Sequence, residues 1–265
     1  MITFEALMNE AKERGMPGGR TRGILREYLQ VLVLKELYRT PAGKLLFFTG
    51  GTYLRLIHGA KRFSEDLDFN AVKLKREDFE DAVRFTAKAL LKEGFTVKTE
   101  FTYRRNLLTG GLIFPDAEEK YGVVSKYSKK EGIVLKIEAN LPSWKVVSET
   151  LLVSGFGQMF PVFCTQKEAL FSDKIDALIK KNRARHLYDI IFMLSRKYPV
   201  DAKILKLFGI TKDPLTAVKE RVDSFSTAEL KKQAEDLRPF LFNEAETGLL
   251  INAKTIIPQL IEKYK

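Results

Sequence analysis

One stretch near the start of the chain has apolar residues at helical spacing. Leu25, Leu29 and Leu32 follow one another at intervals of three or four residues, and Pro41 ends the pattern. The spacing predicts a helix over 22–38.

Short apolar or alternating runs after this helix indicate strands. Residues 45–48 are all apolar and predict a buried strand. Residues 66–72 alternate between polar and apolar and predict a strand with one exposed face. Helices are expected over 53–59 and 76–92, and further strands over 95–105, 111–114, 121–128 and 132–141.

Beyond residue 165 the pattern is helical almost throughout, including the stretches 168–181 and 183–198. A mixed sheet with flanking helices, followed by an all-helical half, is typical of an α+β protein. We expect an α+β core over 1–164 and a mostly helical carboxy-terminal lobe over 165–265.

The composition limits the chemistry of any metal site. The chain has 265 residues with one cysteine, Cys164, and two histidines, His58 and His186. A single thiol forms no internal disulfide, and these three residues cannot build a zinc site of the usual Cys/His kind. A bound metal would therefore need carboxylate ligands.

The charge and the distribution of apolar residues indicate the compartment and the class of partner. The sequence has no secretory signal and no apolar run of the roughly 20 residues that span a membrane, so a cytoplasmic protein without a membrane partner is expected. The chain has 45 Lys and Arg against 34 Asp and Glu, a net charge of +11. This excess favours nucleic acid, nucleotides or an acidic protein as partner.

A glycine pair lies between the predicted strand 45–48 and the helix that follows it. Gly50 and Gly51 lack a Cβ atom, which permits a tight turn and lets backbone N–H groups approach a phosphate. Thr52 could add a hydroxyl group. A glycine pair alone is most often only a turn.

Two acidic residues are spaced so that they share one face of the next strand. Asp66 and Asp68 are two residues apart, whereas Leu67 and Phe69 point to the other face. Paired carboxylates can hold Mg²⁺, which prefers oxygen ligands and can bridge nucleotide phosphates. Further along, Lys136 and Glu138 share a face of the strand predicted over 132–141. An ordinary cross-strand ion pair would explain that second pair equally.

Taken in order, these blocks resemble a known family. A Gly-Gly-(Ser/Thr) block followed by Arg-x-Ser-x-Asp-Leu-Asp-Phe resembles the nucleotidyltransferase β superfamily, and more narrowly the AbiEii/AbiGii or MenT toxin family. The matching residues are Gly50, Gly51, Thr52, Arg62, Ser64, Asp66, Asp68 and Phe69. No Walker A motif, Rossmann glycine pattern, nucleophile elbow or HExxH motif competes with this interpretation.

Two later blocks extend the resemblance, which covers about residues 45–196. The segment 134–140 is similar to the family's Lys-Ile-Glu strand. The segment 173–194 is similar to its Lys-x-x-Ala-Leu helix and the Arg-Asp-Leu-Tyr-Asp-Leu run that follows, through Lys174, Ala177, Leu178, Arg185, Tyr188 and Asp189. His186 departs from the pattern, since the family commonly has an acidic residue there. We expect a surface or capping histidine.

The resemblance implies a nucleotidyltransferase core whose active site the helical lobe completes. Catalytic roles fall on Asp66, Asp68, Glu138, Lys174 and Asp189, with Mg²⁺, or Mn²⁺ in its place, held by Asp66, Asp68 and Glu138. The NTP substrate would be bound by Gly50, Gly51, Thr52, Arg62, Ser64, Lys136 and Arg185. Whether Arg62 touches the ligand or only braces its loop is open at this stage.

The resemblance further implies a toxin of a toxin–antitoxin or abortive-infection system, with a cognate antitoxin as partner. Some members of the family add nucleotides to the 3′ acceptor end of tRNA, and the positive charge fits an RNA acceptor. Basic stretches at 102–106, 126–130 and 180–185 could contact RNA. Tyrosines could stack on its bases, namely Tyr103, Tyr121 or Tyr127.

Two alternatives remain open from the sequence. One is a nucleotidyltransferase that modifies a small, antibiotic-like cation, which would need an acidic acceptor pocket. The other is a nucleotide-binding regulatory protein that keeps the scaffold without catalysing transfer. An assay of labelled NTPs with tRNA and with small acceptors separates these possibilities.

Overall fold

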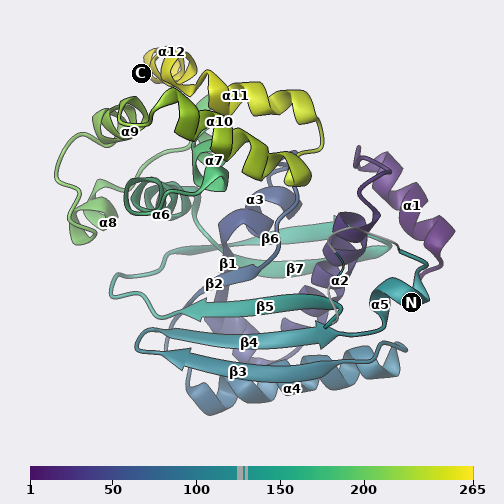
Figure 1. The fold of residues 1–265 in the computed structure, drawn as a ribbon. Coiled ribbons are helices and arrows are strands. Elements are labelled where there is room, and N and C mark those ends of the chain that lie inside the picture. Colours follow the sequence, from purple (N-terminus) through teal and green to yellow (C-terminus); the bar gives the residue numbers. More distant parts are fainter. Residues whose placement is uncertain (124–127, 129–130, 265) are drawn as a thin grey trace. The chain divides into compact units, whose positions relative to one another are not determined.

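The fold is taken from a computed structural model that describes residues 1–123, 128 and 131–264 (Figure 1). These residues form two compact units, Met1–Thr165 and Gln166–Lys265. Within the described part of the chain, no helix is long and apolar enough to cross a membrane.

The first unit is built on a mixed sheet. Seven strands run in the order β3-β4-β5-β2-β1-β7-β6 within the described residues. Their bounds are β1 (Leu46–Thr49), β2 (Leu67–Ala71), β3 (Lys98–Arg104), β4 (Leu107–Phe114), β5 (Ile133–Asn140), β6 (Ser148–Gly155) and β7 (Gln158–Thr165). β2 runs parallel to β5, and β1 runs parallel to β7, whereas the other neighbours are antiparallel.

The described residues of the first unit form five helices, of which the two longest pack on one face of the sheet. They are α1 (Phe4–Glu13), α2 (Thr21–Leu37), α3 (Gly50–Leu56), α4 (Arg76–Lys92) and α5 (Ala117–Lys120), with a 3₁₀ turn at Pro41–Leu45. Helix α4 lies against β3 and β4, and α2 contacts β5, β6 and β7 (Figure 1). Burial follows the strand alternation, since Phe48, Phe69 and Ile137 are inaccessible to solvent on the helix-covered face.

A pair of adjacent glycines on β4 distinguishes the two faces of the sheet. A Cβ atom on Gly110 would lie 2.9 Å from a methyl carbon of Val83 on α4, so this face packs closely on the helix. A Cβ atom on Gly111 would lie 2.6 Å from Cγ of Glu100, whose side chain crosses the opposite face. That opposite face carries exposed polar residues of β3 and β5.

A buried ion pair holds α3 to α2. Arg55 Nε donates to Glu27 Oε2 at 2.8 Å, and these residues are only 4% and 2% exposed. Arg14 reaches the other oxygen of the same carboxylate, with Nη2 at 3.3 Å from Oε1. Because the first turn of α3 contains the glycine pair, this ion pair fixes the helix that follows the turn.

The second unit consists of helices. They are α6 (Lys167–Lys180), α7 (Ala184–Ser195), α8 (Ala202–Leu207), α9 (Pro214–Asp223), α10 (Thr227–Leu237), α11 (Thr247–Ile251) and α12 (Ala253–Tyr264). Short polar residues begin three of them: Asp201 and Asp213 accept backbone N–H groups, and Ser226 forms a capping box with Glu229. Pro258 lies inside α12.

The structure confirms the α+β class, and most elements occur where the sequence predicts them. The helix predicted over 22–38 is α2, and the bounds of α4 are those predicted, 76–92. Helix α1 and the β6–β7 hairpin were not predicted from the sequence. The strand predicted over 121–128 is wrong at its start, because Tyr121 and Gly122 form a turn, and residues 124–127 lie outside the described part.

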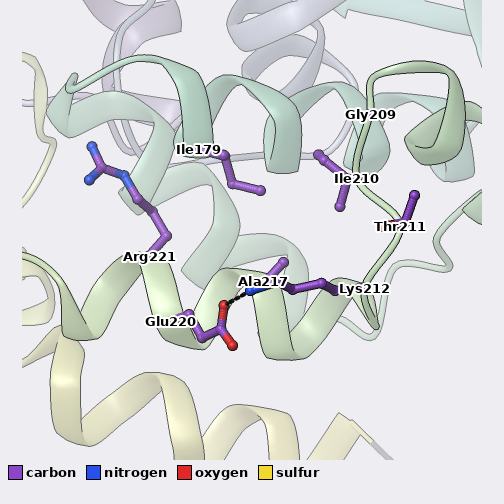
Figure 2. A pocket seen from close by; sticks show the side chains of 8 residues that line it. All are labelled: Ile179, Gly209, Ile210, Thr211, Lys212, Ala217, Glu220 and Arg221. Carbon is purple, nitrogen blue, oxygen red and sulfur yellow. Dashed lines mark hydrogen bonds and ion pairs between the residues drawn. The ribbon is translucent and has the colours of Figure 1, made fainter.

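Figure 2 shows a pocket that lies wholly within the second unit. It has a volume of about 360 Å³ and is lined by Ile179, Gly209, Ile210, Thr211, Lys212, Ala217, Glu220 and Arg221. Lys212 and Glu220 form an ion pair across it at 2.5 Å (Figure 2). Arg221 also donates from Nε to the Leu178 carbonyl near the end of α6.

Removing one member of the buried ion pair should destabilise the first unit strongly. We expect Glu27→Leu to lower the free energy of unfolding by about 3–5 kcal/mol, because the buried ion pair with Arg55 is broken. The double variant Glu27→Leu/Arg55→Met should lose less than the single variant. Urea unfolding followed by circular dichroism measures both, and equal losses would contradict the assignment.

Candidate functional site

The turn between β1 and α3 packs directly against the second motif block. Gly50 has a φ of +80°, and a Cβ atom there would lie 2.1 Å from Oδ2 of Asp68. A Cβ atom on Gly51 would lie 2.7 Å both from Nη2 of Arg62 and from Oγ of Ser64. The two blocks that the sequence keeps apart are therefore in contact, and a Cβ atom at either position of the turn would displace a side chain of the second block.

Two residues expected to bind nucleotide make structural contacts within the first unit. Thr52 is inaccessible to solvent, and its hydroxyl donates to the Asp66 carbonyl at 2.5 Å. Arg62 is 2% exposed, and its Nη1 donates to the Phe63 carbonyl at 3.0 Å. Both side chains therefore stabilise the loop that carries Asp66, and their contact with a nucleotide stays a prediction.

Helix α2 holds that loop from the other side. Gln30 Nε2 donates to the carbonyls of Ser64 and Glu65 at 3.0 and 3.1 Å, and Arg26 forms an ion pair with Glu65. Ser64 itself stays half-buried. Gln30 was not among the residues predicted from the sequence, although a polar residue on the apolar stripe of a helix was a usable signal.

The register of the sheet places Asp68 beside Glu138. In the parallel pair β2–β5 these residues lie directly opposite each other, and Thr49 on β1 lies opposite Asp68 on its other side. Residues that lie directly opposite each other on neighbouring strands point to the same face of the sheet, so the three side chains share one face. The backbones of neighbouring strands lie about 4.8 Å apart. Asp66 precedes β2 by one residue, and continuing the register places it near Lys136, which is exposed.

The donor set suits a hard divalent cation, with two carboxylates rather than three. Asp66 and Asp68 are half-buried and supply oxygen atoms, and Mg²⁺ is usually held by one or two carboxylates together with substrate phosphates and water. Across residues 1–123, 128 and 131–264, no three acidic, histidine or cysteine side chains converge as a metal-binding cluster. The structure thus brings Glu138 next to Asp68 without assembling a three-carboxylate site.

The second unit contains a buried ion pair between two predicted site residues. Lys174 Nζ on α6 donates to Oδ2 of Asp189 on α7 at 2.7 Å. Asp189 is inaccessible to solvent, whereas Lys174 keeps a small accessible surface. The carboxylate therefore fixes the direction of the ammonium group. Arg185 lies in the first turn of α7 and is half-buried.

His186 is not the surface or capping residue that the sequence suggested. It lies inside α7 at 8% exposure, and neither ring nitrogen has a hydrogen-bond partner among the described residues. Burial lowers the pKa of His186 to about 3, and the nearby charge of Lys174 adds to this effect. The imidazole is therefore neutral at physiological pH.

The structure also corrects part of the predicted RNA contact surface. The Tyr103 ring lies under the guanidinium of Arg76, with Cζ 3.6 Å from the ring centroid, and its hydroxyl donates to Glu80. Tyr121 is buried, and its hydroxyl donates to the Ile2 carbonyl. The Tyr121 ring is therefore not available for a base, and Arg76 already covers one face of the half-buried Tyr103 ring. Tyr127 and most of the stretch 126–130 lie outside the described residues.

Solved structures show which fold class this arrangement belongs to. MenT4, a nucleotidyltransferase toxin from Mycobacterium tuberculosis H37Rv, is 17% identical with a TM-score of 0.62, over 99% of this chain and 90% of that chain. JHP933 from Helicobacter pylori is 18% identical with a TM-score of 0.53, over 91% and 93% of the two chains. A protein from H. pylori described as a candidate nucleotidyltransferase is 18% identical with a TM-score of 0.57, over 90% and 94%. The chain therefore has a nucleotidyltransferase-like fold.

The sequence pattern of one family identifies the chain more closely. Residues 32–248 match the family described as nucleotidyl transferase AbiEii toxin, type IV toxin–antitoxin system, so the chain belongs to the AbiEii family of nucleotidyltransferase toxins. The match spans the glycine turn, the carboxylates and the Lys174–Asp189 pair. No protein of curated function matches the sequence significantly.

The contact between Gly50 and Asp68 can be tested against a matched glycine. Gly59 has a φ of +73° with no atom within 4 Å of its Cβ position, so Gly59→Ala should cost only the strain of a left-handed residue, about 1–2 kcal/mol. Gly50→Ala should cost more and lower nucleotidyl transfer at least tenfold, because the added methyl group displaces the Asp68 carboxylate. Unfolding free energies and transfer rates measure this. Similar losses of transfer in the two variants would contradict it.

Burial of His186 predicts an acid sensitivity of the fold. The ordinary pKa of histidine is about 6.5 and the folded value is about 3, so the unfolded chain binds one more proton between these limits. This stabilising contribution is complete above about pH 6.5 and is lost as the pH falls toward 3. The unfolding free energy of the wild type should fall by up to about 1.4 kcal/mol per pH unit more than that of His186→Leu. Parallel profiles would refute the assignment.

Proposed function

We propose that this toxin is a cytoplasmic, Mg²⁺-dependent nucleotidyltransferase that transfers NMP from an NTP to the 3′ hydroxyl of RNA, with the tRNA acceptor end as target. A cognate antitoxin would control it. The main support for the proposal is the register of Asp68 opposite Glu138. The turn at Gly50 packs so closely on Asp68 that a Cβ atom at position 50 would collide with its carboxylate.

In the first unit, some residues would bind Mg²⁺ and others would bind the phosphates of the NTP. Asp66 and Asp68 would hold Mg²⁺, and Glu138 lies in register with Asp68 on the neighbouring strand. When bound, the cation neutralises phosphate charge and lowers the pKa of an attacking hydroxyl group. Gly50, Gly51 and Ser64 would contact the β- and γ-phosphates, since these positions border the carboxylates.

The roles of Thr52, Arg62 and Lys136 differ by their exposure. Thr52 and Arg62 are buried and would keep the loop in place rather than touch the ligand. Lys136 is exposed next to Asp66 in the register and would contact the triphosphate. These three residues would contribute by positioning charge, and positioning of charge supplies much of the rate enhancement in phosphoryl transfer.

Lys174 and Asp189 would supply a cation of fixed direction. The ammonium group is held at 2.7 Å from an inaccessible carboxylate, so its orientation is set before substrate binds. We assign to Lys174 a contact with the triphosphate and to Asp189 the positioning of Lys174. Arg185, half-buried one turn before Asp189, would add positive charge for the nucleotide.

The reaction requires one bond to form and one to break. The 3′ oxygen of the acceptor bonds to the α-phosphorus as the bond to the leaving pyrophosphate breaks, and the acceptor proton is released. The net charge of +11 supports an RNA acceptor, because phosphate neutralisation dominates affinity for nucleic acids. A small cationic acceptor gains nothing from that charge.

The proposal predicts that Asp66→Asn abolishes transfer without unfolding the protein. Each α-labelled NTP is incubated separately with purified protein, Mg²⁺ and total tRNA, and the label on RNA is counted. We expect the wild type to label tRNA and Asp66→Asn to lose at least about 100-fold of this activity, because one carboxylate of the metal site becomes neutral.

Asp81→Asn is the matched control. Asp81 is exposed on α4, and the same change of charge there should leave transfer unaffected. Full transfer by a folded Asp66→Asn protein would refute the metal site. Label on a small acceptor but on no RNA would refute the proposed substrate.

A further inference from the structure

We propose that the open face of β5, β4 and β3, beside Asp68 and Glu138, binds the single-stranded 3′ end of the RNA acceptor. This inference rests on the proposed function and gives the acceptor a place on the protein. The geometry that carries it is a set of side-chain rows that run from the carboxylates to the edge of the sheet.

The register defines these rows. Thr102 on β3 lies opposite Thr109 on β4, and Thr109 lies opposite Glu138 on β5, which is itself opposite Asp68. A second row joins Arg104, Leu107 and Asn140, and a third joins Glu100, Gly111 and Lys136. Residues that are opposite each other share one face, so hydroxyl, amide and cationic groups continue outward from the carboxylates.

This face of the three strands is the one that α4 leaves uncovered. Gly110 faces the helix, whereas its neighbour Gly111 faces the side chain of Glu100. Lys136 and Asn140 on β5 are exposed, as are Thr102 and Arg104 on β3. A nucleic-acid strand bound across β3, β4 and β5 would therefore contact side chains that are exposed to solvent.

The cations on the two sides of the sheet differ in their pairing. On α4, Arg76 and Arg84 form ion pairs with Glu80, and they lie over the rings of Tyr103 and Phe101. On the open face, the side chains of Lys98, Arg104 and Lys136 have no ion-pair, hydrogen-bond or ring partner among the described residues. Lys98 and Arg104 remain free to neutralise phosphate groups of the RNA, and Lys136 lies where this face meets the proposed triphosphate site. Glu100 and Glu138 are the acidic residues of β3, β4 and β5.

The dimensions and polarity suit a short single strand. Three strand spacings separate β2 from β3, which is about 14–15 Å. This length covers roughly two to four nucleotides of an unpaired end. The exposed large apolar side chains of the described residues include none from β3, β4 or β5, whereas the centre of a protein–protein interface is usually apolar or aromatic. Nucleic acid therefore fits this face better than a protein partner does.

Charge reversal at the outer end of the face tests the inference. The variant Lys98→Glu/Arg104→Glu changes two residues that have no role in binding the nucleotide. Its control is Lys88→Glu/Lys92→Glu, which makes the same change at exposed positions of α4, on the other side of the sheet. Labelled transfer to tRNA gives the KM for RNA at several salt concentrations, and fluorescence titration gives the affinity for Mg²⁺–NTP.

We expect the β3 variant to raise the KM for RNA about tenfold at 0.15 M salt and to keep the wild-type affinity for NTP. The slope of log affinity against log salt concentration should fall by about 0.7 for each phosphate group that the variant no longer neutralises. The control should match the wild type in both respects. Wild-type transfer together with an unchanged KM in the β3 variant would overturn this inference alone. Absence of transfer to any RNA by the wild type would overturn the proposed function and this inference with it.

Discussion

The arrangement of the site depends on one close approach, that of the Asp68 carboxylate to the Cα atom of Gly50. A side chain at position 50 would occupy the place of that carboxylate, so the β1–α3 turn can lie on β2 only without one. The same condition holds for Gly51 against Arg62 and Ser64. The two sequence blocks can pack together because the glycines have no side chains. Substitutions at either glycine would therefore disturb the packing of both blocks.

Helix α2 serves as the common support of this region. Glu27 holds α3, Gln30 and Arg26 hold the loop before β2, and Tyr38 donates its hydroxyl to carbonyls of β1 and β7. These polar residues lie on or next to a helix whose other buried residues are mostly apolar. A buried polar group destabilises the fold unless it has a hydrogen-bond partner. Each of these α2 residues therefore also specifies which element packs against the helix at that point.

Periodicity in the sequence predicted those parts of the fold that depend on near neighbours. Helices α2 and α4 follow from apolar spacing, and the shared face of Asp66 and Asp68 follows from alternation. The register of Asp68 opposite Glu138 joins residues 70 positions apart, and no local pattern encodes it. The β6–β7 hairpin was missed partly because Pro161, which lies within β7, is uncommon inside strands. The burial of Tyr121 depends on Tyr28 and Phe95, which pack against its ring from distant parts of the sequence.

The charges of β3 have a further consequence for the solubility of the protein. β3 is an edge of the described sheet, and an edge strand offers unpaired backbone groups to any passing chain. Lys98, Glu100 and Arg104 alternate along it, so two copies brought edge to edge would have to bury these charges. The same side chains that make the strand polar therefore oppose self-association, and replacing them with apolar residues would turn this edge into a nucleus for aggregation.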